Sequence, residues 1–248
     1  MALPRLILAI TFARAEGWRA AAGDGLRVMP PRQMQHTLAA DDGVPAAAVA
    51  TKDVAWVKRC YPTQTSAAGR PRCVVFDLDG CLWTPEMYQL SWVGGGPPFT
   101  PSDDGALGPV TLLADVREVM RELHVAPEWR GTKVAISSRC DEPDWAAELL
   151  DNFRIDDDTG GTFALREVFD PSLIEICPDD KRDQFERLSE RSGIPLEEMV
   201  FFDNEPGNVR SVARMGVTCV YSPEGVTNDA WRLALDEFPA SEGEALGW

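Results

Sequence analysis

The chain has 248 residues, enough for one large domain or two small ones, and its 44% hydrophobic and 26% charged residues are ordinary for a globular protein. Residues 71–248 hold 35 of the 40 acidic residues but only 15 of the 24 basic ones, which leaves residues 1–70 basic. An acidic surface repels a phosphate backbone, which excludes nucleic acid as a partner, and no apolar run approaches the ~20 residues of a membrane span, which excludes the membrane.

Residues 1–70 are expected to form an N-terminal extension outside the folded domain. They are rich in Ala, Gly and Pro and lack sustained periodicity, which is typical of a disordered segment or a targeting signal. An apolar run at 6–12, followed by Ala13-Arg14-Ala15 with the form of a signal cleavage site, favours targeting. We predict a cytoplasmic location, with an organelle reached through the extension as the alternative. A short helix at 53–60 is a further prediction.

From Arg72 onward, strand and helix signals alternate. Short apolar runs predict strands at 73–76, 133–136, 173–176, 199–202 and 217–221. Helical spacing, caps and Gly or Pro stops predict helices at 110–123, 143–150, 180–192, 206–215 and 228–238. This alternation predicts an α/β fold over residues 71–240, with a central parallel sheet covered by helices on both faces.

The segments between these elements are predicted to be small. The many Gly and Pro residues at 83–108 indicate an irregular flap, and residues 241–248 are expected to be a frayed polar tail. Asp141 is the expected N-cap of the helix at 143–150. Between Ser138 and Lys181 we expect only one helix, a turn and a strand. No segment is therefore large enough to form a cap domain.

Polar residues stand at, or soon after, the ends of four predicted strands. In chain order they are Asp77-Leu78-Asp79-Gly80, Ser137-Ser138-Arg139, Lys181 and Asp203-Asn204-Glu205. Open parallel sheets bind their ligands at the carboxyl ends of the strands, so these side chains are expected to converge on one edge.

Their chemistry suits phosphoryl transfer. Asp77 is a competent nucleophile toward phosphorus, through an aspartyl-phosphate intermediate. With Asp203 it offers the hard oxygen ligands that Mg²⁺ prefers. Ser138 can donate to a phosphoryl oxygen, and Lys181 supplies a fixed positive charge. Asp79 can protonate the leaving oxygen and then deprotonate the attacking water.

Each segment alone has a plainer explanation. D-x-D-G is an ordinary turn, and Ser138 could be a turn or cap residue. Lys181 could be a solvated surface charge, and Asp203 could cap the helix that begins near 206. Arg139 is the candidate for contacting a substrate beyond its phosphate, with a surface ion pair as the alternative. The order and strand-end placement of all four segments favour a single site.

These segments resemble the four motifs of the haloacid dehalogenase (HAD) superfamily of hydrolases. Residues 76–83 (FDLDGCLW) resemble motif I, residues 136–139 (ISSR) motif II, Lys181 motif III, and residues 200–205 (VFFDNE) motif IV. Within the superfamily the chain is most similar to the eukaryotic magnesium-dependent phosphatases, through the Trp after motif I, the Ser-Arg pair of motif II, residues 185–188 (FERL) and residues 216–220 (GVTCV). The similarity spans residues 72–238.

The resemblance implies a Rossmann-like, HAD-like three-layer sandwich without a cap domain, dependence on Mg²⁺ and hydrolysis of phosphomonoesters. It implies that Asp77 is the nucleophile and Asp79 the acid/base, and that Ser138 and Lys181 bind phosphate. Ser137 is the alternative phosphate donor, and the Ser-Arg pairing favours Ser138. It places the metal on Asp77, Asp203 and the main-chain carbonyl of Asp79.

Two residues depart from the superfamily pattern. Cys81 stands where many members have Thr, and Asn204 stands where a second Asp is common, so the metal affinity is in question. Asn204 can still hydrogen-bond a metal-bound water. Without a cap the site should be open, and aromatic residues of the flap could line its mouth or serve as packing anchors. They are Trp83, Tyr88, Trp92 and Phe99.

The preferred function is a phosphatase acting on a sugar phosphate, a glycated-sugar phosphate or a phosphotyrosine-type substrate, small or protein-borne, with a monomer favoured. A phosphomutase is disfavoured because it needs a closed site. A dehalogenase is disfavoured because Asp79 suits phosphate esters. A catalytically inactive phosphate-binding or scaffold protein is the alternative from another class.

The spacing of the cysteines does not indicate a metal site or disulfide bonds. The six cysteines are widely spaced, with no C-x-x-C pair and no zinc-type cluster, so we expect reduced structural thiols. Cys81 and Cys140 fall beside the proposed site and could be accessible. The full set is Cys60, Cys73, Cys81, Cys140, Cys177 and Cys219.

Overall fold

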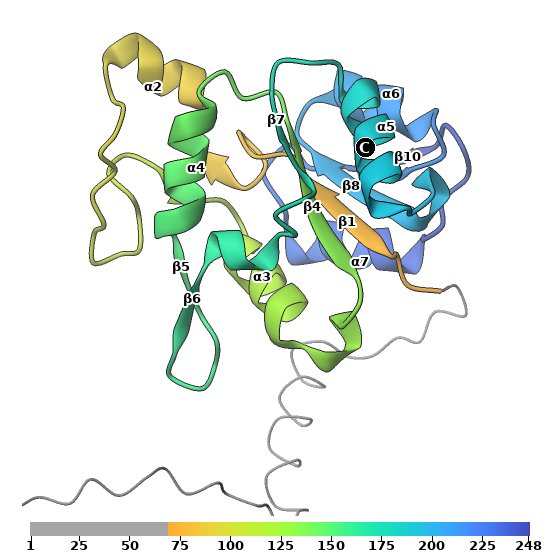
Figure 1. Cartoon of the computed structure of the whole chain (residues 1–248), viewed down its shortest axis with the longest axis horizontal. Coiled ribbons are helices and arrows are strands. Elements are labelled where there is room, and N and C mark those ends of the chain that lie inside the picture. The colour runs from red at the N-terminus through yellow and green to blue at the C-terminus, as the bar shows by residue number, and fades with distance from the viewer. Residues whose placement is uncertain (1–68) are drawn as a thin grey trace, which may run out of the picture. The chain divides into compact units, whose positions relative to one another are not determined.

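The computed structural model describes residues 69–248 (Figure 1). The predictions for the N-terminal extension, including the targeting signal, the helix at 53–60 and Cys60, lie outside the described residues. None of the helices in residues 69–248 combines the length and apolar character that a membrane span needs.

A six-stranded parallel sheet forms the centre of the fold, with strand order β10-β9-β8-β1-β4-β7. The strands are β1 Cys73–Phe76, β4 Lys133–Ser138, β7 Ile174–Ile176, β8 Met199–Asp203, β9 Thr218–Tyr221 and β10 Ala245–Leu246. Five of them were predicted from apolar runs that agree to within about two residues, the usual uncertainty of element ends. The predicted parallel α/β sheet is confirmed.

Helices cover both faces of this sheet (Figure 1). They are α2 Met87–Val93, α3 Val116–Val125, α4 Pro143–Asn152, α5 Lys181–Ser192, α6 Pro206–Ala213 and α7 Asn228–Asp236, with short 3₁₀ turns η1 Pro127–Trp129, η2 Leu165–Val168 and η3 Leu196–Glu198. Asp180 caps α5 by accepting a hydrogen bond from the backbone of Arg182. Asp141 does not cap α4: Glu142 occupies the N-cap position, without a side-chain cap bond.

Two hydrophobic cores lie on opposite faces of the sheet. Along β1, Val74 and Phe76 pack in the core under α3, α4 and α7, whereas Cys73 and Val75 pack in the core under α5 and α6. Successive side chains of a strand point to opposite faces, so a strand buried on both faces is apolar throughout. This arrangement is the three-layer sandwich predicted from the sequence, and residues 69–248 contain no separate cap domain.

The flap differs from the prediction because part of it is regular. Strand β2 (Trp83–Thr84) pairs antiparallel with β3 (Thr111–Leu112), and α2 lies between them in sequence. The predicted helix at 110–123 is therefore wrong at its start. Leu113 donates its backbone N–H to Leu82, and the helix begins only at Val116, because pairing with β2 overrides the local helical pattern.

Two further segments were missed. The tail expected to be frayed forms β10, and Trp248 stacks on Tyr221 at 4.8 Å between ring centroids, with Arg210 over its ring at 4.4 Å. Between Ser138 and Lys181, an antiparallel hairpin of β5 (Arg154–Asp156) and β6 (Thr162–Ala164) adds to the predicted helix and strand.

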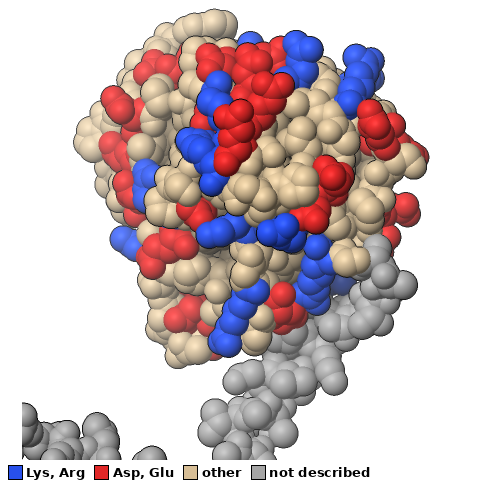
Figure 2. All heavy atoms as spheres, turned by 45° about the vertical axis from the view of Figure 1, so that its right-hand side comes forward, with Lys and Arg blue, Asp and Glu red and all other residues tan. Residues whose placement is uncertain are grey.

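On the face shown in Figure 2, acidic and basic side chains lie intermixed.

Candidate active site

The sheet places Asp77 and Asp203 side by side. Strand β1 pairs with β8 in the register Phe76↔Phe202, and the backbone N–H of Asp77 donates to the carbonyl of Phe202 at 3.0 Å. Each aspartate is thus the next residue after a paired phenylalanine. The chain runs from β1 toward β4 and β7, then crosses to β8 on the other side of β1. Such a switch point is where open α/β sheets bind ligands.

A buried lysine joins the two carboxylates. Lys181, the first residue of α5, places its Nζ 2.6 Å from Asp77 Oδ1 and 3.3 Å from Asp203 Oδ2, and it also contacts the carbonyl of Ser137. Burial alone would lower the pKa of Lys181, but the charges of Asp77 and Asp203 raise it above its usual value. The structure thus places Lys181 at the site and not at the surface.

Asp203 is held by its own loop and by α6. The backbone N–H of Glu205 donates to Oδ1 at 2.6 Å, and the side-chain amide of Asn208 donates to Oδ2 at 3.0 Å. Burial and the charge of Asp77 raise the pKa of Asp203 to about 7 in spite of Lys181. Two buried carboxylates thus share one ammonium, and with both ionised the site would hold more negative charge than Lys181 can offset. Asn208 was missed in the sequence because an Asn in the first turn of a helix carries no distinctive signal.

Asp79 is held by the turn that follows β1. Its Oδ1 accepts from Trp83 Nε1 at 2.7 Å, and its Oδ2 accepts from the backbone N–H of Met87 at 3.2 Å. Gly80 has φ +73°, and a Cβ there would collide with the side chain of Asn204, so this turn requires glycine. Burial raises the pKa of Asp79 to about 6, although the hydrogen bond from Trp83 opposes the shift.

The two serines that end β4 have different partners. Ser138 lines the pocket, and its Oγ accepts from the backbone N–H of Cys140 at 3.2 Å, which leaves its own proton to be donated elsewhere. The hydroxyl of Ser137 instead donates to Gln184 at 2.6 Å. Gln184 returns hydrogen bonds to the carbonyls of Ser138 and Cys177. This buried amide fixes the loop and was missed in the sequence.

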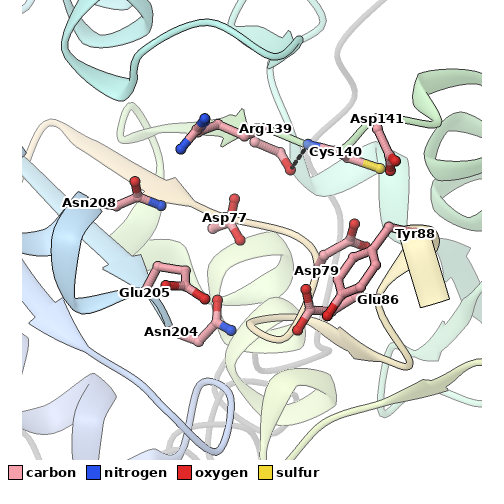
Figure 3. A pocket seen from close by; sticks show the side chains of 11 residues that line it. Asp77, Asp79, Glu86, Tyr88, Arg139, Cys140, Asp141, Asn204, Glu205 and Asn208 are labelled. Atoms are coloured by element: carbon pink, nitrogen blue, oxygen red, sulfur yellow. Dashed lines mark hydrogen bonds between the residues drawn. The ribbon is translucent and has the colours of Figure 1, made fainter.

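These elements enclose a pocket of about 390 Å³ (Figure 3). In Figure 3, Asp77 lies at its centre, with Arg139 on one side and Glu86 and Tyr88 on the other. The lining residues are Asp77, Asp79, Glu86, Tyr88, Ser138, Arg139, Cys140, Asp141, Asn204, Glu205 and Asn208. Arg139 is the one basic residue of this lining, so the pocket is acidic.

Of the four flap aromatics, only Tyr88 lines this pocket. Trp83 and Phe99 are buried packing residues, and Trp92 is 81% exposed with its ring against Tyr88. Cys81, expected to be accessible, is fully buried because it packs in the core; Cys140 lines the pocket although it is also largely buried. All five described cysteines are free thiols.

A divalent cation fits the chemistry of this site. Within residues 69–248 no cluster of three or more His, Cys, Asp or Glu side chains is arranged for a metal. Two carboxylates with excess negative charge do meet, at Asp77 and Asp203. Asn204 Oδ1 is buried there without a hydrogen-bond partner. An acceptor of this kind suits a water bound to a hard cation, which takes oxygen ligands and keeps several waters.

The sequence of the described domain matches that of a known family: residues 70–241 match the acid phosphatase family. The chain belongs to the acid phosphatase family. This phosphatase is therefore a hydrolase, and the HAD-superfamily resemblance predicted from motifs I to IV is confirmed.

Two relatives share most of the matched segment with this phosphatase. Human Magnesium-dependent phosphatase 1 is 32% identical over 179 residues, which cover 69% of this chain and 89% of the human protein. HAD-like hydrolase superfamily protein P8B7.31 of Schizosaccharomyces pombe is 34% identical over 157 residues, covering 60% and 83%. The phosphatase-domain structure of BF1531 from Bacteroides fragilis has a TM-score of 0.46 at 17% identity, covering 71% of this chain and 42% of that one.

Proposed function

We propose that this phosphatase hydrolyses phosphomonoesters with Mg²⁺ and with Asp77 as nucleophile. The observation that carries the proposal is the shared contact of Lys181 with Asp77 and Asp203. It brings a nucleophile, a second carboxylate and a fixed cation to one point at the carboxyl edge of the sheet. The human relative is named a magnesium-dependent phosphatase, which supports the choice of metal.

The residues of the pocket divide the reaction between them. Lys181 holds Asp77 Oδ1, which leaves Oδ2 to attack phosphorus and form the aspartyl-phosphate. Ser138 lines the pocket and Lys181 contacts Asp77 beside it, which supports their role in holding the phosphoryl oxygens. Asp79 gives a proton to the leaving oxygen and later takes one from the water that hydrolyses the intermediate. Each of these roles is a proposal that rests on side-chain position.

Asp77, Asp203 and the main-chain carbonyl of Asp79 are the proposed ligands of the ion. When bound, Mg²⁺ would supply the positive charge that this acidic pocket needs to accept a phosphate. Asn204 contributes no charge where a second aspartate is common, but its unpaired Oδ1 can accept a hydrogen bond from a metal-bound water.

The substrate is proposed to be a sugar phosphate or a phosphotyrosine-type group. Residues 69–248 form no cap over the pocket, which supports entry of either a small molecule or a side chain on a protein. Arg139 is the proposed contact beyond the phosphate because it is exposed and lines the pocket. A monomer, and a cytoplasmic location with an organelle as the alternative, remain predictions.

Asn204 is the observation that favours the competing function, a phosphate-binding scaffold without turnover. A missing second carboxylate weakens a metal site, and without the metal the acidic pocket opposes a phosphate dianion. Against this stand Asp77 and Asp79, both of which line the pocket with their carboxylates in place. Turnover separates the two functions.

The test is hydrolysis of 4-nitrophenyl phosphate by the full chain, with Mg²⁺ and with a chelator. We expect activity only with Mg²⁺, and loss of at least about a thousandfold in kcat for Asp77→Asn, because the amide cannot attack phosphorus. Asp170→Asn removes the same charge away from the pocket and should keep full activity. Activity that survives complete chelation would remove the metal from the proposal, and absence of turnover on any ester would favour the scaffold.

A further inference from the structure

Trp83 is fully buried, yet its indole nitrogen points to the proposed acid/base. Nε1 donates to Asp79 Oδ1 at 2.7 Å, across a turn that the backbone closes independently. In that turn the N–H of Gly80 donates to the carbonyl of Trp83 at 2.9 Å, and the N–H of Leu82 donates to Leu78 at 2.7 Å. Backbone hydrogen bonds therefore close the turn without the indole N–H, whose hydrogen bond holds the Asp79 carboxylate.

The second oxygen of Asp79 has a different partner. Oδ2 accepts from the backbone N–H of Met87, the first residue of α2, at the longer distance of 3.2 Å. From the flap Asp79 thus accepts one short and one long hydrogen bond, from donors on either side of Pro85. The Cys140 thiol, beyond Ser138 and Arg139, also interacts with this carboxyl group, but the shortest bond comes from Trp83.

The two donors also distinguish the two oxygens chemically. An indole N–H donates and cannot accept, so Oδ1 must remain an acceptor in both protonation states of Asp79. A proton on Asp79 is therefore directed to Oδ2, where the contact with Met87 is longer and leaves a lone pair for it. The buried carboxyl then presents one defined O–H.

We propose that Trp83 is a positioning residue that fixes Asp79 Oδ1 as an acceptor and leaves Oδ2 to carry the proton to the leaving group. This inference rests on the proposed function and assigns it a further residue. As Asp77 forms its bond to phosphorus, the ester P–O bond breaks and its electron pair stays on the leaving oxygen. That oxygen takes the proton from Oδ2, and Asp79 becomes a carboxylate held by both donors.

A purely structural role is the alternative, because Trp83 also stacks on Phe153 with 6.4 Å between ring centroids. A buried indole needs an acceptor for its N–H, and Asp79 could serve only that need. The two roles predict different substrate dependence. A lost packing contact weakens catalysis for every ester, whereas a misplaced proton donor matters only where the leaving group needs the proton.

The experiment compares the wild-type full chain with Trp83→Phe, with Mg²⁺, on glycerol phosphate and on 4-nitrophenyl phosphate. An alkoxide needs a proton to leave, whereas 4-nitrophenolate is stable as an anion. We expect kcat/KM on glycerol phosphate to fall at least about tenfold and kcat/KM on 4-nitrophenyl phosphate to fall less than about threefold, because kcat/KM covers the steps up to the aspartyl-phosphate and not its hydrolysis. Asp79→Asn should abolish this difference, so that adding Trp83→Phe to it has no further selective effect.

Phe153→Leu is the matched control, since it removes the stacked ring and keeps the indole N–H. It should lower both rates by the same factor. If Trp83→Phe does not fold, site-specific replacement of Trp83 by benzothienylalanine keeps the ring shape without the N–H and should give the same selective loss.

Equal losses of kcat/KM on the two esters, or no loss on either, would overturn the role of Trp83. Asp77→Asn in the same series tests the proposed function separately, because it should remove turnover of both esters.

Discussion

Two clusters of ion pairs lie along α5, and the charges of their buried carboxylates are balanced in different ways. At its N-terminus a single Lys181 contacts two buried carboxylates, those of Asp77 and Asp203. Toward its C-terminus two arginines, Arg187 and Arg191, contact the buried carboxylate of Glu175 on β7, and Arg187 also contacts the half-exposed carboxylate of Asp179.

The exposure of the cations explains the difference. Arg187 and Arg191 keep 37% and 41% of their side chains exposed, so water and Asp179 stabilise the positive charge that Glu175 does not neutralise. Lys181 is 1% exposed, and the pKa of Asp203 is raised to about 7. The buried carboxylate of Glu175 is therefore neutralised by protein side chains and needs no further cation. The Lys181 cluster has negative charge left over, as a site for a metal cation requires.

The largest expected effect comes from removing the single cation. Lys181→Met should lower the free energy of unfolding by about 3–5 kcal/mol, because it leaves two buried carboxylates without a compensating positive charge. It should also abolish hydrolysis of 4-nitrophenyl phosphate. Urea denaturation at pH 7.5 measures the stability, through the midpoint at constant slope.

Glu175→Gln is the matched change in the other cluster. It should cost only about 1 kcal/mol, since both arginines retain contact with water, and it should keep the activity. The comparison between the clusters would be broken if Glu175→Gln cost as much stability as Lys181→Met.

A smaller effect is expected from adding the missing charge. Mg²⁺ should stabilise the wild-type chain, by about 2.7 kcal/mol at a hundred times its dissociation constant, because it binds the folded site and not the unfolded chain. Thermal unfolding with Mg²⁺, and with Na⁺ at matched ionic strength, measures this shift.

The shift should be strongly reduced in Asp203→Asn and retained in Glu175→Gln. A midpoint that does not respond to Mg²⁺ in the wild type would mean that the excess negative charge has another purpose.

The smallest effect concerns a surface ion pair on the same sheet. Asp170 accepts hydrogen bonds from Lys133 at 2.7 Å and from Ser172, and they lower its pKa to about 2. Its unfolded pKa is about 3.9, so its contribution is full above that pH and is lost as the pH falls toward 2. Asp170→Asn should cost less than about 1 kcal/mol at pH 7.

Urea denaturation between pH 7 and pH 3 should show the stability difference between wild type and Asp170→Asn shrinking below about pH 4. Asp103→Asn, at an exposed position, is the control for the charge change. A difference that stays constant down to pH 3 would contradict the assignment to Lys133.

The parts of the fold that could be predicted are those in which local pattern and tertiary structure agree. Strand β1 is a short apolar run followed by Asp77, strand β8 is one that ends in Asp203, and the parallel arrangement brings their ends together. Strand β10 is only two residues long and has no period to detect, so its pairing with β9 depends on tertiary contacts such as that of Trp248 with Tyr221.

The supporting residues of the site were the least predictable. Asn208 reaches Asp203 from α6, and Gln184 reaches the end of β4 from α5, through side-chain hydrogen bonds that leave no pattern in the sequence. Trp83 was noticed as an aromatic residue after motif I, but its bond to Asp79 depends on the turn geometry. Lys181 could be assigned only through its order among the four motifs.

The central claim is that Asp77 is the nucleophile at this single site. The most direct measurement is acid quenching during turnover with Mg²⁺, followed by borohydride reduction and peptide mass spectrometry, which converts a phosphorylated aspartate into homoserine. We predict conversion at position 77 in the wild type and none in Asp77→Asn. Conversion at another aspartate, or rapid product formation without any conversion, would contradict the account.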